Sequence, residues 1–276
     1  MRQTNLLDET FDKSKSPQYH LSLQTGIKGL TYCILDTDRN KYIAFRHYPA
    51  NNNDFTDTVL ATDDLLRLTY KSVSLIMQDG QNTLVPEDLF EETTQDWAAK
   101  LNLNVLTGDT VQNNRLENCK TVNIFTCSQN LLTKFKIIHP DIKIFHYTTP
   151  VIDHMVRWSA KWSRTKMIIV INSTTVNIGL AQMRKLEFFN TFDYKDFSDI
   201  LYYTLAVAEK NGISAQNGEF FVSADIDNSD EVFTYLKKYL QSVKTIRPSE
   251  QFSYSYVIDE QHLTRFFNLF NLVLCE

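Results

Sequence analysis

The chain has 276 residues, of which 43% are hydrophobic and 12% aromatic, and its formal net charge is −5. A chain of this length buries a full core, and two lobes are the expected organisation. The 28 basic and 33 acidic residues include no block of like charge, so nucleic acid is not an expected partner. No apolar run reaches about 18 residues, so no membrane insertion is predicted.

The N-terminal residues 1–18 are polar, show no periodicity and include Pro17, so we predict a mobile leader there. No continuous apolar segment follows the first basic residue, as a secretory signal would require, which favours a cytoplasmic location. The four cysteines form no C-x-x-C pair, so neither a zinc site nor a disulfide framework is expected.

The first lobe, residues 19–165, begins with three β-rich segments that are separated by turn-like residues. A helical pattern over residues 54–70 follows and leads to a strand at 72–78, which gives the order β-β-β-α-β. Further strands are predicted at residues 103–107, 122–127 and 142–147, with helices at 88–101, 128–138 and 150–162. The first lobe is therefore predicted to be mixed α/β.

The stretch from Arg157 to Lys166 mixes basic residues with two tryptophans, as surfaces that bind nucleic acid do. At helical spacing, however, Met155, Trp158 and Trp162 form one apolar stripe. We expect this stripe to be buried, with the charges on the solvent face.

The second lobe, residues 166–276, repeats the opening pattern. Three strands at 167–172, 175–182 and 186–192 precede a helix at 195–212, and a strand at 219–224 follows. A helix at 229–240, a strand at 242–246 and an amphipathic stretch to residue 274 complete the order βββαβαβα. The two openings lie about 145 residues apart, which indicates a domain duplication rather than a repeat array.

Two segments of the second lobe raise a question of burial. Phe188, Phe189, Phe192 and Tyr194 cluster along one strand and its exit, where neighbouring side chains point to opposite faces of the sheet. We expect the helix at 195–211 to cover them; if it does not, an exposed aromatic patch would mark an interface. The apolar face of residues 260–274 is expected to dock on the second lobe.

In its order of elements the chain resembles the actin-like ATPase superfamily, and more closely a Bacteroidota family, domain of unknown function 3822. The resemblance covers nearly the whole chain from about Tyr19. It implies an α/β fold of duplicated actin-like (ribonuclease H-like) lobes, each opening β-β-β-α-β.

In active members of the superfamily, each half begins with a strand ending in an Asp-x-Gly turn. The Asp positions the metal ion and the attacking water, and the glycine lets backbone N–H groups approach phosphate oxygens. The matching turn in the first half is Gln24-Thr25-Gly26. A neutral glutamine amide does not replace a carboxylate at a magnesium ion that carries triphosphate.

The second half has Asn172-Ser173-Thr174-Thr175 at the matching turn, without glycine, so we expect a plain hairpin. The family also has a Gly-Gly pair after a late strand, where this chain has Ser223-Ala224-Asp225. Asp225 is expected to cap a helix or to face solvent. These ten positions are the candidate cofactor-binding residues of a degenerate cleft, with no catalytic residue, metal site or cofactor predicted.

The chain has only seven glycines and none of the common phosphate-loop, nucleophile-elbow or zinc motifs. The sequence therefore favours a non-enzymatic scaffold or interaction protein, a pseudo-ATPase that binds another protein or associates with itself. Two alternatives stay open: a divergent ATP-binding protein or weak ATPase or kinase that uses the inter-lobe cleft, and a small-molecule sensor.

Overall fold

The computed structural model describes residues 3–50 and 55–276, and the chain divides into two compact units. Unit 1 contains Met1–Pro150, Ser249–Asp259 and Asn268–Glu276, and unit 2 contains Val151–Pro248 and Glu260–Phe267. The predicted boundary between residues 165 and 166 thus lies inside unit 2. The C-terminal segment is divided between the two units rather than belonging to the second lobe alone.

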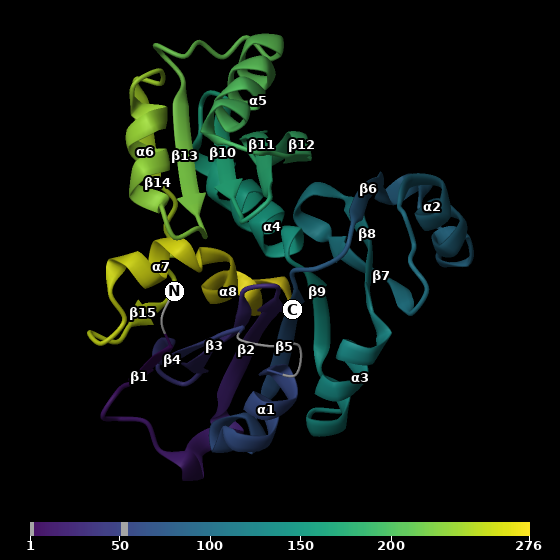
Figure 1. Ribbon diagram of the computed structural model, residues 1–276, viewed down its shortest axis with the longest axis vertical. Helices are drawn as coiled ribbons and strands as arrows, with labels where there is room; N and C mark the ends of the chain where they lie inside the picture. The colour runs from purple at the N-terminus through teal and green to yellow at the C-terminus, as the bar shows by residue number, and fades with distance from the viewer. Residues whose placement is uncertain (1–2, 51–54) are drawn as a thin grey trace. The chain divides into compact units, whose positions relative to one another are not determined.

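The main sheet of unit 1 has the strand order β1-β4-β3-β2-β5-β9, and β15 also pairs with β4 (Figure 1). β2, β3 and β4 form an antiparallel meander, whereas β5 and β9 run parallel to β2. The bounds are β1 Thr4–Leu7, β2 Tyr19–Gly26, β3 Gly29–Asp36, β4 Lys41–Pro49, β5 Ser72–Met77, β9 Lys143–His146 and β15 Ser253–Tyr254. Every residue of β2 and β3 is buried, as expected for central strands.

Two helices complete the core of unit 1. α1 (Phe55–Thr62) contributes Val59 and Leu60 to it, and α3 (Gln129–Ile138) contributes Leu132 and Phe135. The predicted helix over residues 54–70 ends early: residues 64–67 form a separate 3₁₀ turn capped by the buried side chain of Asp63, and residue 54 lies outside the described part of the chain.

An additional three-stranded sheet lies between β5 and α3 in the chain, with the order β6-β8-β7 (Figure 1). Its elements are β6 Asn82–Pro86, α2 Gln95–Asn102, β7 Asp109–Leu116 and β8 Thr121–Ser128. We call residues 82–128 the inserted subdomain. No strand forms at residues 103–107, where one was predicted. The strand in this part of the chain is β7, which begins at Asp109. Its segment, DTVQNNRL, has too few apolar residues for an alternating pattern to reveal it.

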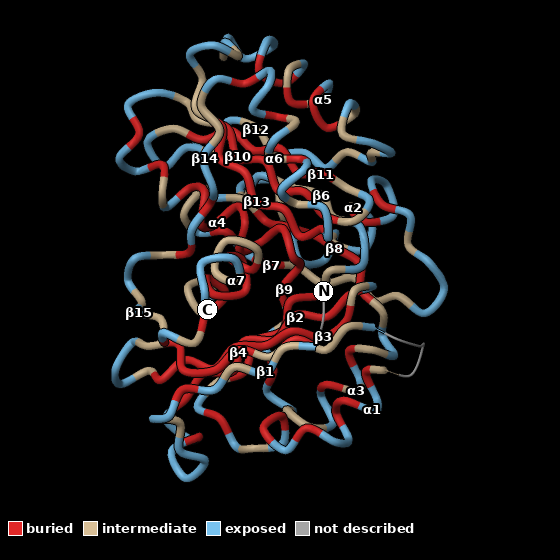
Figure 2. Tube along the Cα trace, turned by 60° about the vertical axis from the view of Figure 1, so that its left-hand side comes forward, coloured by how far each residue is buried: buried red, intermediate tan, exposed pale blue. Residues whose placement is uncertain are grey.

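The sheet of unit 2 has the order β12-β11-β10-β13-β14. This is the same order as β4-β3-β2-β5-β9 in unit 1, which confirms the duplication. Figure 2 shows the central strands of both sheets as buried. The bounds are α4 Thr148–Trp158, β10 Lys166–Ile171, β11 Thr175–Gln182, β12 Lys185–Asp193, α5 Phe197–Lys210, β13 Glu219–Ala224, α6 Ser229–Lys237, β14 Ser242–Thr245 and α7 Glu260–Arg265.

Both predicted aromatic stripes of unit 2 lie against protein. Met155 and Trp162 are buried, and the Trp158 ring packs edge-on against Trp162, with centroids 5.2 Å apart. In β12, Phe188, Phe192 and Tyr194 pack against the core cluster that includes α5, and Phe192 stacks on Tyr203 of α5 at 4.6 Å. Phe189 lies next to Gly179 on β11, beside Met155. The alternative of an exposed aromatic patch on β12 is therefore wrong.

The described part of the predicted mobile leader, residues 3–18, is instead held against the sheet. β1 pairs antiparallel with β4, from Thr4 opposite His47 to Leu7 opposite Ala44. Asp8 follows and is buried, and its carboxylate accepts hydrogen bonds from Lys41 Nζ at 2.8 Å and Thr10 N at 2.8 Å. These bonds hold the pKa of Asp8 well below its usual range. Because the segment is polar, its sequence did not indicate the edge strand β1 or the buried Asp8 that follows it.

The C-terminal end of the chain is buried in both units, but it is not one continuous helix. α7 is followed by α8 (Phe267–Asn271) and a 3₁₀ turn at residues 272–275. In unit 1 the fully buried Phe270 ring packs edge-on against Tyr42 at 5.0 Å, and its carbonyl accepts a hydrogen bond from Tyr42 Oη at 2.5 Å. The prediction that this segment docks on the second lobe is therefore corrected for residues 268–276.

Phe270→Ala should lower the free energy of unfolding of unit 1 by about 3–5 kcal/mol, because it removes a buried ring and leaves a cavity. Chemical denaturation followed by circular dichroism measures the change. The matched control is Tyr256→Ala, which removes an aromatic ring that is 78% exposed and should change stability by less than about 0.5 kcal/mol. Equal effects of the two substitutions would contradict the packing.

Two histidines are buried in apolar surroundings. His146 in unit 1 lies beside the Phe125 ring, and its Nδ1 is 2.7 Å from Thr148 Oγ1. His154 in unit 2 stacks on Trp158 and contacts Phe267. Burial lowers the pKa of each from 6.5 to about 4. Between these values the unfolded chain binds a proton that the folded protein does not.

Stability should therefore fall as the pH drops from 6.5 to about 4.5, with roughly 1.4 kcal/mol per pH unit from each of these histidines. Denaturation midpoints across this range measure the slope. His154→Gln and His146→Gln should each reduce it by about that amount. A slope that stays the same in both variants would contradict the assignment.

Candidate functional site

The turn that ends β2 holds the first three candidate residues, and all three are buried. Gln24 is 5% exposed, and its Oε1 accepts a hydrogen bond from Asn268 Nδ2 at 3.0 Å, within unit 1. The side chain of Gln24 is thus neutral and is bonded to an amide of the same unit. The short helix α8 supplies that amide.

Gly26 closes β2 opposite Gly29 of β3, so only Ile27 and Lys28 form the connection. A Cβ on Gly26 would lie 2.6 Å from Oε1 and 2.8 Å from Cβ of Gln78. Close packing against Gln78 is therefore sufficient reason for a glycine here.

The second turn, in unit 2, is a tight hairpin between β10 and β11. Asn172 N donates to Thr175 O at 2.8 Å, so only Ser173 and Thr174 lie between them. From the next strand's end, Tyr194 Oη donates to Asn172 O at 2.5 Å and Tyr194 N donates to Thr174 O at 3.1 Å. Two carbonyls of the turn thus accept bonds from one residue, as in a closed structural hairpin.

The end of β13 holds the last three candidates, and α7 covers it within unit 2. Ser223 Oγ donates to Thr264 O at 2.8 Å. Asp225 Oδ1 lies 2.6 Å from Arg265 Nε, and both side chains are only about one-tenth exposed. The predicted helix cap or solvated acid is wrong for Asp225: its partner is a buried arginine.

Seven of the candidates meet at one edge of unit 2. β10 and β13 run parallel, with Ile171 opposite Ala224, so the Asn172 turn and the Ser223–Asp225 segment end side by side. Asp225 N donates to Ile171 O at 2.8 Å and continues the ladder. Gln24, Thr25 and Gly26 occupy the equivalent strand end in unit 1.

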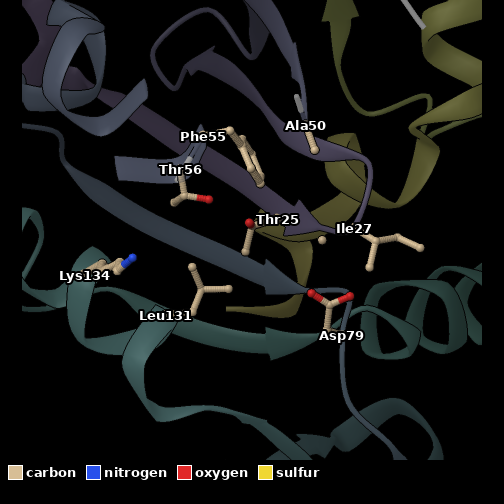
Figure 3. A pocket seen from close by; sticks show the side chains of 9 residues that line it. Thr25, Ile27, Ala50, Phe55, Thr56, Asp79, Leu131 and Lys134 are labelled. Atoms are coloured by element: carbon tan, nitrogen blue, oxygen red, sulfur yellow. The ribbon is translucent and has the colours of Figure 1, made fainter. Parts of the chain in front are cut away.

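Unit 1 also has a pocket of about 500 Å³ at the carboxyl ends of its parallel strands β2 and β5. Thr25 and Gly26 line it, and Asp79 follows β5. In Figure 3, Asp79 and the Thr25 and Thr56 hydroxyls point toward the open space, with α1 on one side and α3 on the other. The full lining is Thr25, Gly26, Ile27, Ala50, Phe55, Thr56, Asp79, Leu131 and Lys134.

The charges of this pocket do not suit a polyphosphate. Among the lining residues the one cation is Lys134, and its Nζ pairs with Asp57 Oδ2 at 2.7 Å. Asp79 is exposed, yet crowding by protein atoms raises the pKa of its carboxyl, with a smaller opposing effect from the Ile27 backbone. The pocket has the volume of a small-ligand site, and its lining favours an uncharged or cationic group.

Sequence reasoning missed the residues that complete these sites. Asn268 and Arg265 come from the C-terminal segment, about 240 and 40 residues from their partners. Their polar positions within an otherwise apolar stretch, RFFNLFN, were the available signal. Asp79 was not among the candidate residues.

The same strand order in two units defines the protein's class: it has the duplicated actin-like fold. One solved structure, a Bacteroides thetaiotaomicron protein with actin-like ATPase fold and unknown function, superposes with a TM-score of 0.80 at 19% identity, covering 97% of this chain and 100% of that one. A PilM–PilN type IV pilus biogenesis complex aligns with a TM-score of 0.59 at 11% identity, covering 92% and 97%.

The chain belongs to the family described as Protein of unknown function (DUF3822), whose model matches residues 8–243. The resemblance inferred from the sequence is thereby confirmed. A comparison with curated proteins found no match. Within residues 3–50 and 55–276, no helix has the length and apolar character needed to cross a membrane.

Arg265→Met should destabilise unit 2 by about 3–5 kcal/mol, because it removes the arginine that pairs with the buried carboxylate of Asp225. The double variant Asp225→Leu/Arg265→Met should recover much of that loss. Arg247→Met is the matched control, since its pair with Glu260 is exposed and should be worth less than about 1 kcal/mol. Denaturation midpoints measure the stability of each variant. A loss of stability in Arg265→Met no larger than that in Arg247→Met would contradict the pairing.

Proposed function

We propose that this protein is a non-enzymatic, cytoplasmic actin-like interaction protein whose nucleotide site is degenerate. The observation that carries the proposal is Gln24, a neutral side chain at the end of β2 that is bonded to Asn268. Activation of water beside a magnesium ion requires a carboxylate there, and none of the three residues of this turn carries one.

Unit 2 supports the same proposal. The turn after β10 has no glycine, and two of its carbonyls accept bonds from Tyr194. Arg265 pairs with Asp225 at the end of β13, where active members present glycine to the adenine. A nucleotide would have to displace these internal bonds, and each displaced buried group would lose about 1–3 kcal/mol of stabilisation.

The interaction part of the proposal draws on the fold. One structural neighbour is a chain of a PilM–PilN type IV pilus biogenesis complex, so a chain with this fold takes part in a protein complex elsewhere. Fold alone does not assign the role to this chain. The surface that would perform it is argued separately below.

Calorimetry with Mg²⁺-ATP or Mg²⁺-ADP should show no binding tighter than about 1 mM, which corresponds to about −4 kcal/mol. Gln24→Asp should not create ATPase activity, because the turn after β10 still lacks glycine. A dissociation constant in the micromolar range for the wild type would overturn the degenerate site and favour a divergent ATP-binding protein.

A further inference from the structure

The outward face of α2 is apolar. Trp97 and Leu101 lie one helical turn apart, so they share a face, and each is 67% exposed. Ala99, in contrast, is fully buried in the small core of the inserted subdomain, together with Leu103, Val122 and Ile124. A surface helix normally places its large apolar residues inward and its small or polar residues outward, so α2 has the reverse arrangement.

The same subdomain exposes two more large apolar side chains, Leu89 at 75% and Leu106 at 60%. Four exposed large apolar residues within a stretch of 18 form a concentration that isolated surface residues do not explain. Trp97 is the strongest candidate for an anchor, because a tryptophan buries a large area at low entropic cost and is enriched among residues that dominate binding.

The segment that carries this face is acidic. Residues 87–109 contain six acidic residues and one lysine, Lys100. Arg115 pairs with Glu87 at 3.1 Å and Glu92 at 3.0 Å. Asp88, Glu91 and Asp96 are exposed and have no ion pair among the residues that the structure describes. They leave the apolar face with negative charge that the protein itself does not neutralise.

We propose that the α2 face of the inserted subdomain binds a basic amphipathic segment of another protein. Apolar side chains of the partner would cover Trp97 and Leu101, and its lysines or arginines would meet the acidic residues that flank them. The inference rests on the proposed function in taking the chain to be an interaction protein, and it adds the chemistry of the partner.

Charge separates this partner from two others. A membrane surface rich in anionic lipid attracts basic segments, so the exposed carboxylates of Asp88, Glu91 and Asp96 oppose such binding. A second copy that met this face with its own would bring like charges together, which is unfavourable at an interface. A basic apolar segment satisfies both features of the surface at once.

Three synthetic peptides of equal length, about 18 residues, test the proposal on the full chain. One is an amphipathic helix of leucine and lysine, the second replaces lysine by glutamate, and the third replaces leucine by serine. Fluorescence anisotropy should show the leucine–lysine peptide binding at least about tenfold more tightly than the other two. Trp97→Ser/Leu101→Ser should weaken that binding about tenfold or more.

The matched control is Tyr202→Ser/Tyr256→Ser, which removes two similarly exposed aromatic residues elsewhere and should leave binding unchanged. Asp88→Lys/Asp96→Lys should lower the affinity and reduce its dependence on salt. Circular dichroism verifies that every variant is folded.

The proposal is overturned if no peptide binds, or if the Trp97→Ser/Leu101→Ser variant binds the leucine–lysine peptide as tightly as the wild type. It is equally overturned if this variant instead abolishes binding to phosphatidylglycerol vesicles or a dimer seen by sedimentation. Nucleotide calorimetry and peptide binding are independent measurements. Failure of the docking surface can therefore be distinguished from failure of the degenerate site.

Discussion

The need to satisfy buried polar groups governs the strand ends of this protein. The ends of β2 and β13 are buried, and a polar side chain in such a place is stable only with a partner. In an active actin-like ATPase the metal ion and the nucleotide would provide such partners. Here Gln24 is paired with Asn268, and Asp225 with Arg265. Both partners come from the C-terminal segment, so the end of the chain completes each unit internally.

That arrangement explains why stability and ligand binding are separable in this fold. A site that waits for a ligand leaves polar groups unsatisfied until the ligand arrives, whereas a site closed by internal bonds is stable without one. The shared order of strands in both units defines the fold, and sheet topology alone does not assign a chemistry.

Local pattern predicted most of the strands because their residues are apolar and β-branched. The segments of β11 and β13 were predicted with the observed bounds, and the repeated order of elements led to the right fold. The polar strands β1 and β7 were not predicted, because they are stabilised by pairing rather than by an apolar pattern. β1 pairs with β4, and β7 pairs with β8. The structure places the candidate residues at or beside strand ends. Their partners were not predicted, since pairing across about 240 residues leaves no local pattern.

The inserted subdomain differs from the two main sheets because it exposes large apolar side chains. α2 covers the small core of this subdomain, which includes Ala99 and Ile124. The largest apolar residues of the helix, however, are exposed to solvent. Exposure of a tryptophan and a leucine on one helical face gives up several kcal/mol of hydrophobic stabilisation that an inward orientation would provide. The proposed complex with a basic amphipathic segment would recover this loss. The duplicated sheets would therefore stabilise the fold, while the segment inserted between β5 and α3 would determine which partner is bound.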